Sequence, residues 1–245
     1  MCFAPDATPP PLPSGRSPLS GSDVTVTSSD GTPVPAYHVL PEQPNGRGVV
    51  VLPDIRGLYP FYKNLAGAFA AEGFEAICLD YFARSDAPAE RGPDFDPWPY
   101  VKVTEVEQVQ ADINAAKSQL QASDVYAVGF CFGGGHAFAL AAAALGFSGV
   151  VGFYGRPYSE NPFYPSAIEL TDRMSCPVLG LFGGGDNSIP ADIVEQFDLE
   201  LTESKVPHEL HTYPGAPHSF FDRSAPEWEE ACADAWRRTL DFLRA

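Results

Sequence analysis

Short apolar runs recur along the chain and alternate with longer stretches in which apolar residues follow helical spacing. The short runs contain few polar residues, which is typical of strands buried on both faces of a parallel sheet. Repeated strand and helix signals predict a mainly parallel, doubly wound α/β sheet with helices on both faces. Strands are expected at residues 48–52, 74–79, 125–129, 148–154, 176–182 and 208–213, and helices at 61–72, 103–121, 132–144, 191–202 and 226–243.

The N-terminal part of the chain departs from this alternation. Residues 24–27 and 34–40 alternate between apolar and polar positions and are separated by Ser-Asp-Gly, which predicts an antiparallel hairpin at one edge of the sheet. Residues 1–20 contain six prolines and no periodic pattern, so we expect an irregular arm. We therefore divide the chain into this arm and a single α/β domain at residues 21–245.

One long apolar stretch, residues 125–155, resembles a membrane span in length. Glycines interrupt it repeatedly and no basic cluster flanks it. We interpret the stretch as a buried strand, an Ala-rich helix and a second buried strand.

The charge balance narrows the classes of partner. Acidic residues outnumber basic ones by 32 to 15, giving a formal charge of −17, which argues against binding to nucleic acid or to an anionic membrane. The first six residues show no secretory signal, and the five cysteines lack CxxC or zinc-type spacing. We therefore expect a cytoplasmic protein with free thiols, and a monomer, although the sequence leaves the oligomeric state open.

A reactive cysteine is predicted where the strand at 125–129 ends. The segment Gly129-Phe130-Cys131-Phe132-Gly133 is the G-x-S-x-G nucleophile elbow with Cys in place of Ser. Glycines flanking such a residue permit a strained backbone and close packing of strand against helix. Cys131 is therefore a candidate catalytic nucleophile.

Other chemically capable side chains follow predicted strands in the same way. Asp54, Arg84, Cys131, Asp186 and His218 all lie just past a predicted strand end. Ligands of open α/β sheets bind outside the carboxyl ends of the strands, so these five residues are expected to converge at one rim.

The order Cys131, Asp186, His218 is the nucleophile, acid, His order of α/β-hydrolases. With Gly-Phe-Cys-Phe-Gly-Gly, Phe-Gly-Gly-Gly-Asp-Asn and Pro-His-Ser-Phe-Phe in this order, the chain resembles the dienelactone hydrolase family, also called carboxymethylenebutenolidases, from about residue 21 onward. The resemblance implies the α/β-hydrolase fold and an enzyme that opens enol-lactones or small esters. Most α/β-hydrolases have Ser in the elbow, so the Cys is the specific feature.

Each member of this set has an expected role. The Cys131 thiolate would attack the substrate carbonyl, and His218 would act as its base. Asp186 would hold the imidazole in the tautomer that leaves one nitrogen free for the sulfur. The backbone N–H groups of Phe132 and Ile55 would bind the oxyanion.

Three further residues are assigned through the resemblance. It implies a carboxylate at Asp54 that hydrogen-bonds the resting thiol, although family members usually have Glu there, one methylene longer. It also implies that Arg84 binds a substrate carboxylate. The family's second such arginine would fall at Asp222, so Arg223, one position later, is the nearest candidate.

Other site types are not indicated. The glycines around Cys131 lack the second glycine of the dinucleotide fingerprint, and there is no Walker motif, HExxH or paired His/Cys metal spacing. We expect a small-molecule ester or lactone substrate and neither cofactor nor metal. The alternatives are a broad-specificity carboxylesterase or thioesterase, and a non-catalytic protein in which Cys131 is a redox or ligand-sensing thiol.

Overall fold

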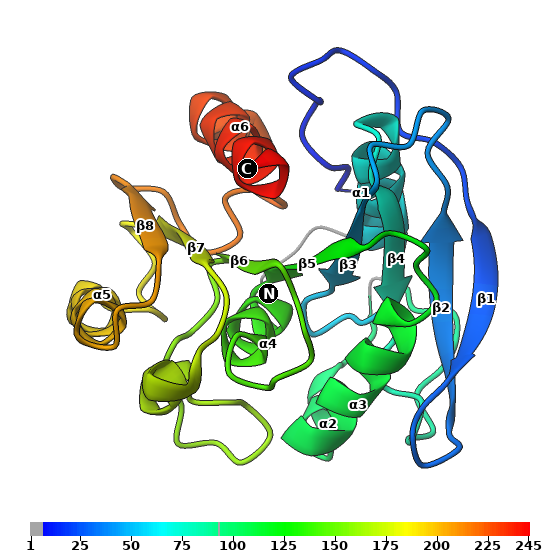
Figure 1. The fold of residues 1–245 in the computed structure, drawn as a ribbon, viewed down its shortest axis with the longest axis horizontal. Coiled ribbons are helices and arrows are strands. Elements are labelled where there is room, and N and C mark those ends of the chain that lie inside the picture. The colour runs from blue at the N-terminus through cyan, green and yellow to red at the C-terminus, as the bar shows by residue number, and fades with distance from the viewer. Residues whose placement is uncertain (1–6, 93) are drawn as a thin grey trace.

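In residues 7–92 and 94–245, the part of the chain described by this computed structural model, eight strands form one sheet in the order β1-β2-β4-β3-β5-β6-β7-β8 (Figure 1). From β4 to β8 across the sheet all pairs are parallel, whereas β1 and β2 are antiparallel to their neighbours. The strands are β1 (Ser22–Thr27), β2 (Pro33–Val39), β3 (Arg47–Leu52), β4 (Glu75–Leu79), β5 (Asp124–Phe130), β6 (Gly149–Phe153), β7 (Val178–Gly183) and β8 (His208–Tyr213).

Helices cover both faces of this sheet. α1 and α6 lie on one face, and α3, α4 and α5 lie on the other (Figure 1). Phe69 of α1 meets Trp236 of α6 edge to face at 4.8 Å between ring centroids, which seals the first of these layers. The α-helices are α1 (Pro60–Ala71), α2 (Trp98–Val101), α3 (Val106–Lys117), α4 (Phe132–Leu140), α5 (Ala191–Glu203) and α6 (Glu229–Arg244), with 3-10 helices η1 (Ala167–Arg173) and η2 (Ala225–Glu227).

The predicted fold class is confirmed. The N-terminal hairpin is antiparallel and lies at the sheet edge. The long apolar stretch at residues 125–155 forms β5, α4 and β6, as predicted. Its apolar character follows from burial, because every residue of α4 and β6 is buried. No helix in the described ranges has the length and apolarity needed to cross a bilayer.

The long helix predicted at 103–121 is wrong in its boundaries. A short helix ends at Val101, and α3 starts only at Val106. The hydroxyl and the amide of Thr104 both donate to the Val101 carbonyl, at 2.8 and 3.1 Å, and close a turn between the two helices. A side chain that satisfies a local carbonyl in this way competes with helix continuation, which periodicity alone does not reveal.

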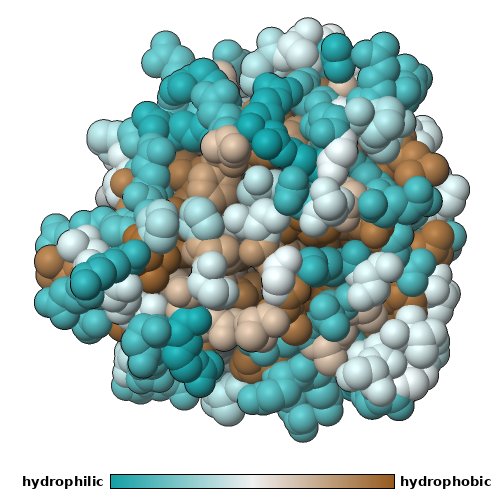
Figure 2. Space-filling model, viewed as in Figure 1, coloured by the Kyte–Doolittle hydropathy of each residue, from teal (hydrophilic) through white to brown (hydrophobic). Residues whose placement is uncertain are grey.

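Residues 1–6 of the predicted arm lie outside the described residues. The later part of the arm contacts α1, where the Leu19 amide donates to the Gly67 carbonyl at 3.0 Å and the Arg16 guanidinium donates to the Ala71 carbonyl at 2.7 Å, whereas residues 7–11 line a hollow beside Arg223 and α6. Figure 2 shows a mostly hydrophilic periphery on the face in view, with apolar residues visible between polar ones near its centre.

Glycines allow β5, α4 and β3 to approach at backbone contact. A Cβ added at Gly129 would meet the Gly133 carbonyl oxygen at 2.0 Å, and one added at Gly133 would meet the Leu52 carbonyl oxygen at 2.3 Å. Backbone atoms cannot move aside as a flexible side chain can, so these two positions require glycine.

We therefore expect Gly129→Ala to lower the free energy of unfolding by about 3 kcal/mol or more, since an unrelieved backbone overlap lies at the severe end of overpacking. Gly92→Ala is the matched control, because a Cβ there meets nothing within 4 Å. Urea unfolding followed by circular dichroism measures both. Equal stability of the two variants would show that α4 is not held against β5 as described.

Candidate active site

Cys131 occupies a strained turn between β5 and α4. Its φ of 53° and ψ of −110° lie in a region that L-residues rarely adopt. The turn is held from both sides, because the Cys131 amide donates to the Phe153 carbonyl of β6 and the Gly133 amide donates to the Pro53 carbonyl after β3, each at 3.0 Å. Cys131 is partly exposed, whereas Cys78, Cys176 and Cys232 are buried.

An acid and a base are paired at the ends of β7 and β8. His218 Nδ1 lies 2.5 Å from Asp186 Oδ2. The other carboxylate oxygen, Oδ1, accepts from the Ser188 amide at 2.8 Å and from the Ser188 hydroxyl at 2.6 Å. With both oxygens engaged, the carboxylate is fixed in orientation, and Nε2 is the ring nitrogen of His218 that remains available.

The electrostatics of this pair favour a protonated imidazole. Burial lowers the pKa of His218, but the Cys131 sulfur and the Asp186 carboxylate outweigh it and raise the pKa to about 11. Burial raises the pKa of the Asp186 carboxyl, but the His218 ring and the hydrogen bonds from Ser188 outweigh burial and lower that pKa. The interaction with sulfur connects His218 to Cys131, so the structure brings all three residues together.

Cys131 and His218 open into a common pocket of about 300 Å³. Its wall is largely aromatic and apolar, and among the described lining residues Arg156 carries the one permanent charge. Other lining side chains include Trp98, Phe132, Tyr154, Phe163, Tyr164 and Ile189. A volume of this size suits a small organic molecule rather than a polymer.

The two expected oxyanion donors also reach this pocket. Ile55 and Phe132 both line it, and the bond from the Gly133 amide to the Pro53 carbonyl holds their segments side by side. Phe132 is the first residue of α4, so its N–H has no acceptor within the helix. The segments that carry both predicted N–H groups therefore meet at Cys131.

Asp54 does not pair with Cys131 in this structure. Both of its oxygens accept from the Arg56 side chain, with Arg56 Nε 3.0 Å from each. Arg56 is fully buried and also pairs with Asp222, four residues after His218. Burial and the nearby Asp54 carboxylate raise the pKa of Asp222 to about 7 against the opposing effect of Arg56. The expected contact between Asp54 and the resting thiol is thus replaced by a buried carboxylate–guanidinium–carboxylate bridge.

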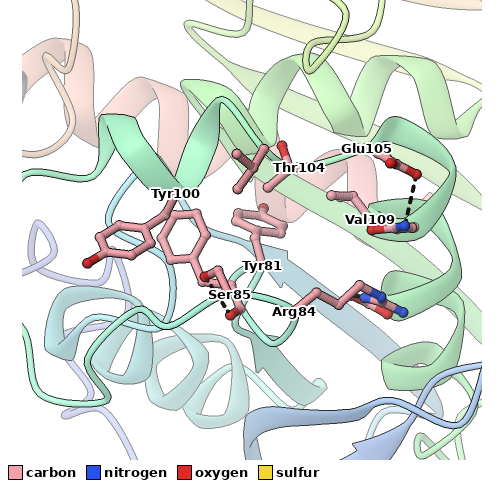
Figure 3. Close-up of a pocket in the computed structure, with 11 residues that line it drawn as sticks. Tyr81, Arg84, Ser85, Tyr100, Thr104, Glu105 and Val109 are labelled. Carbon is pink, nitrogen blue, oxygen red and sulfur yellow. Dashed lines mark hydrogen bonds and ion pairs between the residues drawn. The ribbon is translucent and has the colours of Figure 1, made fainter.

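Arg84 and Arg223 lie away from the Cys131 pocket. Arg84 pairs with Asp30 of the hairpin turn and with Asp112 of α3, and it lines a separate hollow beside Tyr81 and Tyr100 (Figure 3). Arg223 is exposed and lines another hollow, beside the N-terminal arm. Neither hollow contains Cys131 or His218. The structure does not support a substrate-binding role beside Cys131 for either arginine. Arg84 is held by two carboxylates, and Arg223 lies at a different hollow.

Comparison with known proteins decides the family. The model of the dienelactone hydrolase family matches residues 34–245. The chain belongs to the dienelactone hydrolase family. As a member of it, the protein is a hydrolase that acts on ester bonds, and the predicted resemblance is confirmed.

Individual relatives match over most of their length. An Escherichia coli K12 protein named "Putative carboxymethylenebutenolidase" is 30% identical over 234 residues, covering 90% of this chain and 85% of that protein. The carboxymethylenebutenolidase of Rhodococcus opacus is 29% identical over 222 residues, or 86% of each chain. The crystal structure titled putative dienelactone hydrolase from Klebsiella pneumoniae has a TM-score of 0.79 at 27% identity and covers 91% of this chain and 98% of its own.

The sequence did not single out several residues at or beside the Cys131 pocket of this family member. Arg156 follows β6 within a loop, Ser188 orients Asp186, and Tyr154 has a positive φ of 38° and a buried hydroxyl with no hydrogen-bond partner among the described residues. A strand-end rule applied to β6 would have found Tyr154 and Arg156, since both follow its last residue. Across the described ranges no group of three His, Cys, Asp or Glu side chains is placed to hold a metal ion.

We expect Cys131→Ala to lower the pKa of His218, because the sulfur is the strongest influence that raises it. Folding raises the pKa of His218 from an ordinary 6.5 to about 11. The protonated ring therefore stabilises the folded state fully below pH 6.5, and this stabilisation is lost as the pH rises toward about 11. Ring resonances of His218 measured by NMR against pH, assigned with His218→Gln, report the change. An unchanged pKa in Cys131→Ala would contradict the coupling of sulfur and imidazole.

We expect Arg56→Met to lower the free energy of unfolding by about 3 to 5 kcal/mol, because it leaves two carboxylates buried without their cation. The control is Arg237→Gln, which removes a cation that is 56% exposed and pairs on the surface of α6; its cost should stay below about 1 kcal/mol. Chemical denaturation of both variants gives the comparison. Similar costs for the two would show that the buried bridge does not hold its loops together.

Proposed function

We propose that this protein is a cysteine hydrolase that opens an enol-lactone or a small ester through an acyl-thiol intermediate on Cys131. The observation that carries the proposal is the placement of Cys131 and His218 on one pocket, with Asp186 bonded behind the ring. Family membership supports the ester bond as the target, and a carboxymethylenebutenolidase is among the relatives.

The geometry supports the following course for the proposed reaction. The Cys131 sulfur attacks the substrate carbonyl carbon, and the thiol proton resides on His218 Nε2, the nitrogen that Asp186 leaves available. The oxyanion accepts hydrogen bonds from the N–H groups of Ile55 and Phe132, each worth about 3 to 4 kcal/mol in the transition state. His218 then protonates the leaving oxygen as the carbon–oxygen bond breaks.

Hydrolysis of the acyl-thiol completes the cycle. His218 removes a proton from a water molecule, the resulting hydroxide attacks the thioester carbon, and the sulfur leaves with regeneration of the imidazolium. For an enol-lactone substrate the enol released in the first step stays tethered to the acyl chain and tautomerises to a ketone, so the product is a single keto acid.

The thiol-sensor alternative is less well supported. A sensor needs an accessible low-pKa thiol but has no use for a base oriented by a carboxylate. Here the Asp186 carboxylate accepts three hydrogen bonds that fix it against His218. The single-domain organisation, the cytoplasmic location and the monomeric state expected from the sequence are retained as parts of this proposal.

The proposal predicts turnover of p-nitrophenyl acetate, with kcat/KM reduced at least about a thousandfold in both Cys131→Ala and His218→Gln, because members of such a triad act as a unit. Cys176→Ala and His211→Gln are the controls, since these residues lie outside the pocket. Circular dichroism confirms that each variant is folded.

Mass spectrometry of the rapidly quenched enzyme should find the acetyl group on the peptide that contains Cys131. Full activity in His218→Gln, or an acetyl group on another residue, would refute the assignment of nucleophile and base.

A further inference from the structure

Arg156 is placed in the Cys131 pocket by a set of interactions that do not depend on an ion pair. It follows β6 after Gly155, where a Cβ on Gly155 would meet the backbone of Gly134 in α4 at 2.4 Å. The loop that carries Arg156 therefore packs directly against the helix that begins at the nucleophile.

A single hydroxyl connects Arg156 to the nucleophile. The Arg156 amide donates to the Tyr164 hydroxyl at 3.0 Å, and that hydroxyl donates to the Cys131 carbonyl at 3.0 Å. Tyr164 is in turn packed over Gly135, where any Cβ would meet its ring at 2.3 Å. The backbone of Arg156 is thus only two hydrogen bonds away from that of Cys131.

The guanidinium is also fixed on the side of the acid. Arg156 Nη2 donates to the Ser188 carbonyl at 2.7 Å, and the Ser188 hydroxyl bonds Asp186 and lies 3.3 Å from His218 Nδ1. Both ends of Arg156 are therefore positioned relative to Cys131, His218 and Asp186 before any substrate binds. Such preorganisation lowers the entropy lost on binding.

The charge of Arg156 has no counterpart among the described residues. No carboxylate lies within ion-pair distance of it there, although acidic residues outnumber basic ones by 32 to 15 in the whole sequence. The Cys131 pocket has no Asp or Glu among its described lining residues. By contrast, Arg56, Arg84 and Arg91 are each held by acidic side chains.

We propose that Arg156 binds a carboxylate carried by the substrate and so determines which esters the enzyme selects. A guanidinium with free N–H groups matches the planar geometry of a carboxylate, and the surrounding apolar wall strengthens the interaction. The inference rests on the proposed hydrolase function. It assigns the anion site to the loop after β6, and not to Arg84 or Arg223.

A matched substrate pair tests the assignment. p-Nitrophenyl acetate and the mono-p-nitrophenyl esters of succinate and glutarate share a leaving group and differ in the terminal carboxylate. Arg156→Gln should lower kcat/KM for at least one carboxylate ester about 10- to 100-fold, chiefly through KM, and change that for the acetate less than about threefold. Arg156→Lys should restore part of the loss, because it keeps the charge without the fork.

The controls separate this role from a structural one. Arg84→Gln and Arg223→Gln should leave the ratio of the two substrates unchanged. Equal losses on both substrates in Arg156→Gln would show that Arg156 only supports the Ser188 loop and would overturn the proposal. A selective loss in Arg84→Gln, or wild type with no preference for either carboxylate ester, would overturn it as well.

Binding of glutarate distinguishes failure of this inference from failure of the proposed function. Glutarate should bind wild type and Arg84→Gln alike in calorimetry and should bind Arg156→Gln at least about tenfold more weakly, since Arg84 lies outside the Cys131 pocket. If wild type hydrolyses no ester but binds glutarate through Arg156, the hydrolase proposal fails and the anion site stands. If glutarate binds all variants equally or none, the anion site fails whatever the turnover.

Discussion

The backbone contact between β5, α4 and β3 is the constraint on which the candidate site depends. Gly129 and Gly133 let the first turn of α4 lie against the strand ends, and the bond from the Gly133 amide to the Pro53 carbonyl connects it to β3. In this position Cys131 has a positive φ, an arrangement that costs about 1 to 3 kcal/mol and needs surrounding structure to hold it. The same contact brings the segment of Phe132 to that of Ile55, so the predicted nucleophile and the two predicted oxyanion donors are positioned by one set of packing contacts.

The parts of the fold that sequence predicted are those with local causes. β8 begins and ends where expected, and the elbow was found because its glycines and cysteine are adjacent in the chain. The helix at 103–121 was misjudged because Thr104 closes a turn through its own hydroxyl. The 3-10 helix η1 lies in a stretch where neither a strand nor a helix is predicted, since its seven residues carry too short a pattern to identify.

The same distinction between local and long-range causes applies to the residues of the candidate site. Cys131, Asp186 and His218 could be placed together because each follows a parallel strand, and parallel strands end at one rim. The acidic partners of the arginines come from segments distant in the sequence, and a rule based on strand ends does not identify them. Arg84 also follows a strand, β4, but Asp30 and Asp112 from distant segments hold it elsewhere. Nothing in the sequence indicates the two partners of Arg56, although this residue joins the loops that carry Ile55 and His218.

The buried bridge and the Arg156 cation together set the local charge at the Cys131 pocket of a chain with a formal charge of −17. Asp54 and Asp222 both lie close enough to Tyr154, a pocket residue, to influence its ionisation, as does Cys131. Unpaired, these carboxylates would disfavour a thiolate and repel an anionic substrate at short range in a medium of low dielectric. Arg56 offsets part of their charge from behind the pocket wall, while Arg156 and a protonated His218 supply positive charge at its surface. The charged groups among the described lining residues are therefore positive in a protein that is acidic as a whole, which suits the thiolate and the oxyanion of the proposed reaction.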